Sequence, residues 1–336
     1  MSASTGDGEP IRAWRVHELG APLDVMRFET VASPAADATQ VSVAVTASAL
    51  NFADSLLCRG TYQDKPPLPF TPGLEVSGTV IGAPAGSGLR SGQRVIALPS
   101  LPHGGLAERV LAAPADVFPV PDSIDDVTAA ALPVTYQTGW FGLYRRAHLE
   151  PDETILIHAG AGGVGSAAIQ LARARGARVI ATAGGPDKVR QCLELGADVA
   201  VDYRVDDFVA VTNEVTDGRG ADVVYDSVGG DTFDRSRRCI AFEGRIVVVG
   251  FAGGRIAEAP TNHLLVKNYG VLGLHWGRYR LLRPDLVREC HDDLVRLHAA
   301  GQIAPLIGAV RPLDEAAVAL TELVERGTVG KVVLVP

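Results

Sequence analysis

A glycine-rich loop near the middle of the chain has the residue types and spacing of a phosphate-binding turn. The pattern GxGxxG is matched by Gly160, Ala161, Gly162, Gly163, Val164 and Gly165. In such a loop the first glycine permits a tight turn, the second lets the backbone approach a pyrophosphate, and the third lets helix and strand pack closely. The phosphates then meet unpaired N–H groups at the positive end of a helix dipole. Although any strand-to-helix turn favours glycine, a loop in this context predicts a dinucleotide site.

The end of the next expected strand, residues 178–182, bears on which dinucleotide binds. An NAD-binding unit has Asp or Glu at this strand end, about 20 residues after the loop, to hydrogen-bond the ribose 2′-hydroxyl. Here the strand runs into Ala183 and Gly184. The neutral end leaves room for a 2′-phosphate that Lys188 could reach, although a lysine there also fits an exposed helix face. We therefore expect NADPH rather than NADH, and the missing acid also argues against a methyltransferase.

Alternating strands and helices must position this loop. Residues 154–159 form a short apolar run that is typical of a strand buried on both faces, and the apolar residues from Val164 to Ala172 lie on one side of a helix. The unit then repeats. We expect strands at 178–182, 199–201, 221–226 and 244–250, and helices between Pro186 and Gly196 and at 204–216 and 231–241. This alternation predicts an α/β fold with a doubly wound parallel sheet.

The two ends of the chain do not show this alternation of strands and helices. The first 120 residues contain short strands at 41–45, 76–81, 94–98 and 106–111, separated by glycines, and suggest a small barrel. After about Tyr269 the chain is expected to leave the parallel sheet, with 270–273 offering one last strand. Helices from Pro284 and from Asp314 and a terminal strand at 328–335 should then pack against the barrel.

Composition excludes several classes of protein. The 31 Lys and Arg against 39 Asp and Glu give a net charge of −8, which argues against nucleic-acid binding because that needs a dense basic face. The four cysteines lie far apart and suit a reducing, cytoplasmic compartment. No signal peptide or membrane span is recognisable. With 47% apolar residues in 336, we expect a globular protein of two domains.

Motifs along the whole chain resemble one known family. They lie at 51–62, 69–75, 92–95, 104–108, 160–165, 183–184, Lys188, 195–197 and 330–334. Together they resemble the quinone oxidoreductase branch of the medium-chain dehydrogenase/reductase superfamily, the group that includes zeta-crystallin. The resemblance implies a GroES-like β-barrel catalytic domain at 1–125, completed by 270–336, and a Rossmann-fold NADP-binding domain at 126–269. It also implies a homodimer formed through edge strands near 270–276.

The residues at the family's metal positions differ from those of its zinc enzymes. Zinc-dependent members carry a Cys near position 51 and a His before the glutamate of a Gly-His-Glu motif, where this chain has Asn51 and Leu74. Leucine has no donor atom, and a lone Asn oxygen is a poor zinc ligand. The cysteine-rich lobe of a structural zinc is also missing. We therefore expect no metal, so that hydrogen bonds must stabilise any developing oxyanion.

The resemblance also assigns roles to two residues of the barrel. Tyr62 is the candidate to donate a hydrogen bond or proton to the acceptor oxygen, and Asn51 is the candidate to orient the substrate or the nicotinamide ribose. Both have simpler interpretations. A half-buried loop phenol would account for Tyr62, and Asn51 could cap a helix that begins at Phe52.

Further cofactor contacts follow from the same resemblance. Tyr203, after the third strand of the Rossmann domain, is expected to stack on the adenine or to meet the 2′-phosphate. Gly250 and Phe251 are expected to line the nicotinamide. Family members often have serine where this chain has Gly185, so one expected contact to the 2′-phosphate is lost here.

These observations favour an NADPH-dependent, zinc-independent reductase that transfers hydride to a quinone. A second possibility is reduction of an enone or 2-enoyl thioester, and a third, of another class, is a catalytically weak NADPH-sensing or RNA-binding protein. Arg278, Arg280 and Arg283 fit a solvated basic face better than a site for an acyl-carrier phosphate. His158 is interpreted as a satisfied core histidine.

Overall fold

The computed structural model describes residues 8–336, and the chain folds into two compact units. The β-rich unit consists of the described residues up to Val134 together with Ile307–Pro336. The α/β unit is the continuous segment Thr135–Leu306. The α/β unit is therefore inserted in the sequence of the β-rich unit.

The β-rich unit is built on a seven-stranded sheet with the order β14-β15-β3-β4-β5-β7, and β6 pairs with β3. Its strands are β3 (Val41–Ala49), β4 (Val76–Gly82), β5 (Arg94–Ala97), β6 (Arg109–Ala112), β7 (Val117–Pro119), β14 (Ile307–Pro312) and β15 (Lys331–Val335). A separate antiparallel pair is formed by β1 (Pro10–Val16) and β2 (Met26–Ala32). The helices are α1 (Pro22–Val25), α2 (Phe52–Cys58), α3 (Asp126–Ala131) and α12 (Ala316–Val324), with 3₁₀ turns at Pro114–Asp116 and Leu313–Glu315.

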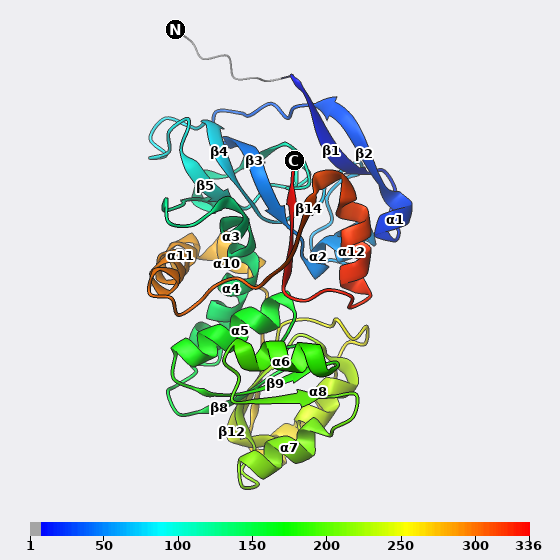
Figure 1. Cartoon of the computed structure of the whole chain (residues 1–336), viewed down its shortest axis with the longest axis vertical. Helices are drawn as coiled ribbons and strands as arrows, with labels where there is room; N and C mark the ends of the chain where they lie inside the picture. The colour runs from blue at the N-terminus through cyan, green and yellow to red at the C-terminus, as the bar shows by residue number, and fades with distance from the viewer. Residues whose placement is uncertain (1–7) are drawn as a thin grey trace. The chain divides into compact units, whose positions relative to one another are not determined.

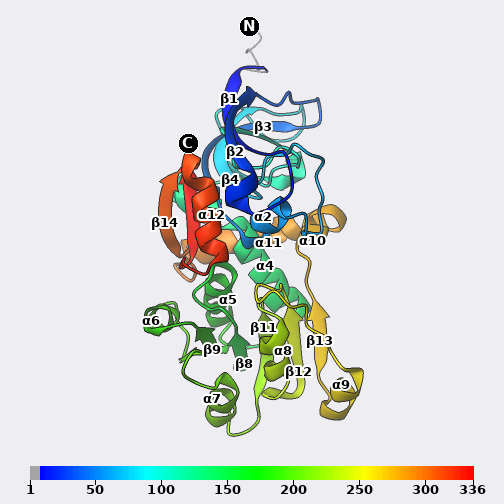
Figure 2. The same cartoon turned by 90° about the vertical axis from the view of Figure 1, so that its right-hand side faces the viewer.

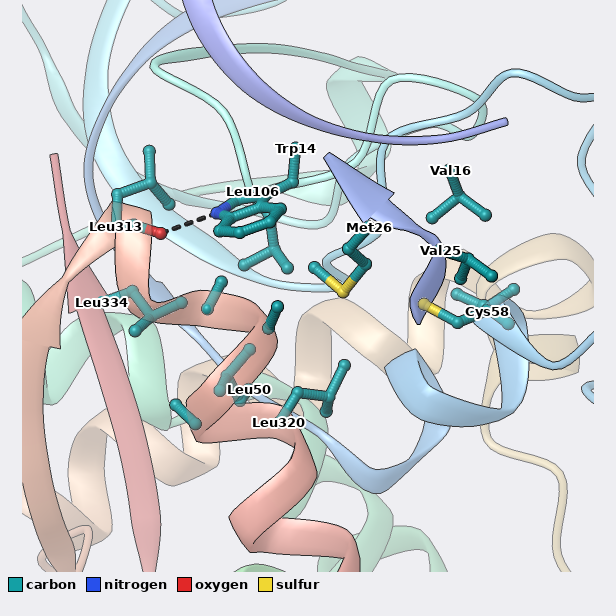
Figure 3. Close-up of a cluster of buried hydrophobic side chains, with 14 of the residues drawn as sticks. Trp14, Val16, Val25, Met26, Leu50, Cys58, Leu106, Leu313, Leu320 and Leu334 are labelled. Atoms are coloured by element: carbon teal, nitrogen blue, oxygen red, sulfur yellow. Dashed lines mark hydrogen bonds between the residues drawn. The ribbon is translucent and has the colours of Figure 1, made fainter. Parts of the chain in front are cut away.

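The core of the β-rich unit joins both ends of the chain. Figure 3 shows side chains from β1, β2 and α2 facing others from α12 and β15. The indole Nε1 of Trp14 donates a 2.7 Å hydrogen bond to the carbonyl oxygen of Leu313. The C-terminal residues are thus part of this unit's core. Because apolar burial is the main stabilising contribution to folding, the unit depends on them for stability. The expectation that the tail packs against the N-terminal strands is confirmed for the helix from Ala316 and for β15, whereas the helix that begins at Pro284 belongs to the α/β unit.

The α/β unit contains a six-stranded parallel sheet with the order β10-β9-β8-β11-β12-β13, part of which is visible in Figure 2. The strands are β8 (Thr154–Ile157), β9 (Arg178–Ala183), β10 (Val199–Asp202), β11 (Ala221–Asp226), β12 (Ile240–Val248) and β13 (Gly270–Gly273). The helices are α5 (Gly163–Ala174), α6 (Pro186–Glu194), α7 (Phe208–Val215), α8 (Gly230–Ser236), α9 (Thr261–Lys267), α10 (Gly277–Leu282) and α11 (Pro284–Ala299). Helix α4 (Pro133–Trp140) begins at the unit boundary and continues as a π-helical segment, Phe141–Arg146. Successive strands are added on one side of β8 up to β10 and on its other side from β11 onward. Open α/β sheets bind their ligands at such a switch point, here between β8 and β11.

Two differences from the sequence-based expectations concern where elements begin and end. Ile240 and Ala241, expected at the end of a helix, belong to β12, which continues through Glu243 in a left-handed conformation (φ 59°). The chain was expected to return to the barrel near residue 270, but the α/β unit extends to Leu306. Gln170 of α5 explains this, because its amide exchanges two hydrogen bonds with the backbone of Ala304.

Candidate active site

The glycine loop joins β8 to α5 at the carboxyl edge of the parallel sheet (Figure 1). A Cβ at Gly165 would overlap the carbonyl oxygen of Ala159, and a Cβ at Gly160 would lie 2.8 Å from the Sγ of Cys192. At Gly162 the nearest atom to a Cβ, the Ala159 oxygen, is 3.3 Å away. Gly162 therefore leaves open space beside the start of α5, where a pyrophosphate could approach the backbone.

The tight turn of this loop does not depend on Gly160 in the way the motif suggests. Ala159 is the residue in the left-handed region, with φ 53°, a conformation that costs a non-glycine residue free energy. Gly160 is needed for space instead, because the Cβ of Ala181 and the Cδ1 of Ile169 also crowd it. The expected role of Gly160 in the turn is thus corrected to close packing.

Residues after β9 and β10 come together at one point of the sheet edge. A Cβ at Gly184 would lie 2.6 Å from the Oη of Tyr203 and 3.2 Å from the Nε of Arg204. A Cβ at Gly185 would lie 3.2 Å from Nη1 of Arg204. A phenol hydroxyl and a guanidinium group therefore lie against the glycines that end β9. Lys188 is half-buried in the first turn of α6, close to them in sequence.

Asp202, the last residue of β10, fixes this arrangement. Its Oδ1 accepts hydrogen bonds from the backbone N–H groups of Gly185 (2.9 Å) and Arg204 (3.1 Å). These bonds lower the pKa of the Asp202 carboxyl below its ordinary value. Arg204 was missed in the sequence, although its position directly after Tyr203 at a strand end was a usable signal.

The segment that contains Gly250 and Phe251 follows β12 at the same edge. Ala252 and Gly253 donate backbone hydrogen bonds to Ser227 and Val228 in the turn after β11. A Cβ at Gly229 would lie 2.7 Å from the ring of Phe251, so the phenylalanine covers that turn. The structure thus places the residues expected to contact the dinucleotide at the carboxyl ends of β8, β9, β10 and β12.

The β-rich unit contains a buried polar cluster around Asn51. The ammonium group of Lys331 donates to Glu75 Oε1 (2.7 Å), to Asn51 Oδ1 (2.8 Å) and to the carbonyl oxygen of Leu50 (2.6 Å). Asn51 Nδ2 donates to the same Glu75 oxygen (2.8 Å) and to the carbonyl oxygen of Ala49 (3.3 Å). Lys331 is 3% exposed and Glu75 is fully buried. A buried charge pair of this kind is tolerated because every donor of the ammonium is satisfied.

Glu75 and Lys331 entered the sequence reasoning only as parts of family motifs. Glu75 directly precedes β4 and Lys331 begins β15, so only the tertiary structure brings them to Asn51. The other oxygen of Glu75 accepts a 2.7 Å hydrogen bond from the backbone N–H of Val134. This donor set binds an ammonium group, and a metal ion placed between Asn51 and Glu75 would be repelled by Lys331. Among the described residues, no three His, Cys, Asp or Glu side chains are grouped to hold a metal.

Asn51 is the N-cap residue of α2, as one interpretation of the sequence expected, and its side chain forms a capping box with Asp54 while it also contacts Glu75 and Lys331. Asp54 accepts hydrogen bonds from the backbone N–H groups of Asn51 (2.8 Å) and Gly73 (3.1 Å). Burial raises the pKa of the Asp54 carboxyl to about 7. The nearby Glu75 adds to this shift and Lys331 opposes it.

This raised pKa has a measurable effect on stability. Between pH 3.8 and about 7 the folded protein keeps a proton on Asp54 that the unfolded chain has lost. The free energy of unfolding therefore falls as the pH rises through this range, by at most about 1.4 kcal/mol per pH unit. We expect wild type to gain stability over Asp54→Asn as the pH falls below 7, measured by urea unfolding of both proteins. Taking the difference cancels the opposite trend from His158, and a pH-independent difference would contradict the raised pKa.

Tyr62 lies four residues after the end of α2, so that this helix separates it from Asn51 in the sequence. Its backbone N–H donates to the carbonyl oxygen of Leu56 (3.2 Å), and its ring is partly buried against the core of the β-rich unit. The ring is therefore anchored while part of the side chain remains accessible. This position is compatible with a hydrogen-bond donor to a ligand and also with a purely structural phenol.

Two other sequence-based interpretations can be compared with the structure. His158 is buried and bonded through its two ring nitrogens to Thr182 and Ser236, and burial lowers its pKa to about 4. It is a satisfied core histidine, as expected. Arg283 forms an ion pair with Asp285, and Arg280 lies over the ring of Trp276. These arginines are thus paired within the α/β unit.

Comparison with known proteins decides the family. Residues 37–122 match the alcohol dehydrogenase GroES-like domain, and residues 163–292 match the zinc-binding dehydrogenase domain. The quinone oxidoreductase-like protein 2 of Bos taurus is 39% identical over 99% of this chain and 95% of its own. The quinone oxidoreductase of Sus scrofa is 32% identical over 96% of this chain and 97% of its own. The chain belongs to the quinone oxidoreductase branch of the medium-chain dehydrogenase/reductase superfamily.

The fold of this family is also found among solved structures. Escherichia coli quinone oxidoreductase, solved as a complex with NADPH, is 30% identical and superposes with a TM-score of 0.89 over 97% of this chain and 100% of its own. The β-rich unit is thus the GroES-like domain, and the α/β unit is the Rossmann domain. Although one family model is named for zinc, this chain has Asn51 and Leu74 at the positions where zinc enzymes have Cys and His. No helix in the described part of the chain is long and apolar enough to cross a membrane.

Proposed function

We propose that this protein is an NADPH-dependent, zinc-independent oxidoreductase that transfers hydride to a quinone. The proposal depends on two features at the same edge of the sheet. The glycine loop has open space at Gly162, and β9 ends without an acidic residue, beside Tyr203 and Arg204. Relatives named quinone oxidoreductase, one of them solved with NADPH, support it. Bound NADPH supplies the hydride.

The residues of this chain divide the remaining tasks. The backbone N–H groups at the start of α5 hold the pyrophosphate, and Arg204, Lys188 and Tyr203 hold the 2′-phosphate. Gly250 and Phe251 line the nicotinamide. Tyr62 donates a hydrogen bond or a proton to the acceptor oxygen, and this stabilises the negative charge that develops there.

Cofactor preference tests the 2′-phosphate site. Arg204→Ala removes a charge-assisted hydrogen bond, so we expect the Kd for NADPH to rise about tenfold, while the Kd for NADH stays the same. Lys188→Ala should act in the same direction, and the double variant should bind the two cofactors about equally. Titration calorimetry with both dinucleotides measures this.

Arg190→Ala is the matched control, because Arg190 is paired with Asp187 on the exposed side of α6. Equal losses of NADPH and NADH affinity would assign Arg204 to structure rather than to the phosphate.

Turnover distinguishes the proposed acceptor from its alternative. We expect purified protein with NADPH to reduce 9,10-phenanthrenequinone faster than crotonyl-CoA or an alkenal. The decrease in NADPH absorbance measures each rate. Turnover of the thioester or the alkenal alone would make this chain a double-bond reductase. Binding of NADPH without turnover of any acceptor would favour a sensing role.

Assembly as a homodimer is also part of the proposal. In the described part of the chain, β13 pairs with β12 and ends the sheet, so its outer edge is free to pair with a second copy. The exposed Leu265 and Val266 of α9 lie close to it in sequence. Light scattering should give twice the chain mass of 35.2 kDa, and a monomer mass at micromolar concentration would contradict this arrangement.

A further inference from the structure

The GroES-like domain contains a cavity of about 180 Å³, and none of the residues proposed to contact the dinucleotide or the acceptor lines it. The lining comes from β1, from the end of β2, from the start of β6 and from the segments around Thr71 and His103. Pockets for drug-sized ligands begin at about 300 Å³, so a ligand of this cavity must be smaller than these.

Alternation along two chain segments brings apolar and basic side chains to the cavity together. Side chains two positions apart share one face of a strand, and Ile11, Ala13 and Arg15 of β1 all line the cavity. Ala107, which forms a β-bridge with Ala13, and Arg109 at the start of β6 follow the same spacing. Each segment therefore contributes apolar surface and one guanidinium group.

The apolar part of the lining is continuous. Ile11, Ala13 and Ala107 form a buried cluster, and Val31 of β2 packs against it. A ligand with an apolar body gains free energy by covering these side chains, at about 25 cal/mol per Å² of apolar surface removed from water. An inorganic anion such as phosphate lacks such a body and gains nothing from this part of the cavity.

The charged part of the lining is entirely basic. It consists of Arg15, His103 and Arg109, and no Asp or Glu of the described residues lines the cavity, although the whole chain has a net charge of −8. Arg15 donates hydrogen bonds to two neutral oxygens, Thr71 Oγ1 (3.3 Å) and the carbonyl oxygen of Pro69 (2.9 Å). Two of its five N–H donors are thus used, and three remain for an anion.

Acidic side chains of the neighbouring segments have basic partners other than Arg15. Burial and the charge of Arg15 lower the pKa of the His103 imidazole below its ordinary value, so this charge acts within the cavity. The acidic side chains contact other bases: Glu108 contacts Arg12 (3.0 Å), Glu29 contacts His17 (2.9 Å) and Glu9 contacts Arg109 (3.7 Å).

We infer that this cavity binds a small organic acid, with its carboxylate at Arg15 and its apolar body against Ile11, Ala13 and Ala107. A guanidinium group donates parallel hydrogen bonds to a carboxylate, which makes this pair strong and specific. An anion at Arg15 also favours the protonated form of His103, which adds a second positive charge to the site. The inference goes beyond the proposed function, because it requires neither NADPH nor a quinone.

Benzoate is a suitable probe, because it joins a carboxylate to a small apolar body. We expect the purified protein to bind it with a Kd of about 1 mM or below in titration calorimetry. Benzamide has the shape without the charge, and inorganic phosphate has charge without an apolar body, so each should bind at least about tenfold more weakly. No saturation by benzoate, or equal affinity for either control, would overturn the inference.

Two arginine variants of β1 test the position of the carboxylate. Arg15→Gln should raise the Kd for benzoate about tenfold. Arg12→Gln is the matched control, because it removes the same charge from the opposite face of the strand, where Arg12 contacts Glu108. It should leave the Kd unchanged. An equal loss of affinity in both variants, or none in Arg15→Gln, would overturn the inference.

Methyl NMR of wild-type protein locates the bound acid without relying on the folding of an arginine variant. The methyl signals of Ala13, Ala32 and Ala107, which line the cavity, should shift when benzoate is added. The signal of Ala161 in the glycine loop should stay in place. Shifts confined to other alanines would place benzoate elsewhere and overturn the inference, whereas a protein that binds benzoate here but reduces no quinone would overturn only the proposed function.

Discussion

Gly162→Ala should lower the affinity for NADPH about 100-fold while leaving the thermal midpoint within about a degree of wild type. The new methyl group has only the Ala159 carbonyl oxygen nearby, at 3.3 Å, so the protein without ligand accommodates it. It would occupy the space through which a pyrophosphate approaches the start of α5. Titration calorimetry and a thermal unfolding scan together measure both quantities.

Gly165→Ala provides the contrast within the same loop. Its methyl group would overlap the backbone of Ala159 and Gly160, so this variant should be destabilised by about 2–4 kcal/mol before any ligand is added. If Gly162→Ala instead bound NADPH with wild-type affinity, the loop would not hold the pyrophosphate. Loss of stability in both variants would mean that both glycines act by packing.

Tyr62→Phe should lower kcat with a quinone about 100-fold, with the Kd for NADPH unchanged. The substitution keeps the ring that packs against the core and removes only the hydroxyl group. Because the hydroxyl is needed as charge develops on the acceptor oxygen, the loss should appear in kcat rather than in cofactor binding. Stopped-flow measurement of NADPH oxidation under single-turnover conditions reports the hydride step directly.

Tyr144→Phe is the matched control for Tyr62→Phe. The hydroxyl of Tyr144 donates a 2.8 Å hydrogen bond to the carbonyl oxygen of Leu171 inside the α/β unit. Its removal should cost about 1 kcal/mol of stability and leave kcat unchanged. A decrease of less than threefold in kcat for Tyr62→Phe would assign this residue to structure.

The parallel sheet was predictable because its signals are local. Strands such as β8 are short apolar runs, and glycines or prolines mark the ends of most helices, so each unit can be recognised within a few residues. The β1–β2 pair was missed since nine residues, including a short helix, separate Val16 from Met26, and no two-residue turn signals a hairpin. The extension of the α/β unit to Leu306 depends on Gln170, whose bonds to Ala304 cross 134 positions of sequence.

The two halves of the candidate site differ in the same way. The glycine loop is one continuous motif, so its position beside α5 followed from spacing alone. The surroundings of Asn51 did not, because Lys331 lies 280 positions away and only the pairing of β15 with β3 brings it near. A lysine in a terminal strand gives no local sign of being buried. For that reason Asn51 was interpreted as a helix cap or a ligand contact, and its charged neighbours were overlooked.

The placement of β14, α12 and β15 has a consequence for biosynthesis. A ribosome synthesises every residue of the Rossmann domain before residues 307–336, which complete the interrupted GroES-like domain. Until then Glu75 has no lysine beside it, and the indole of Trp14 has no carbonyl partner at Leu313. We therefore expect the flanking domain to close only after residues 307–336 have left the ribosome.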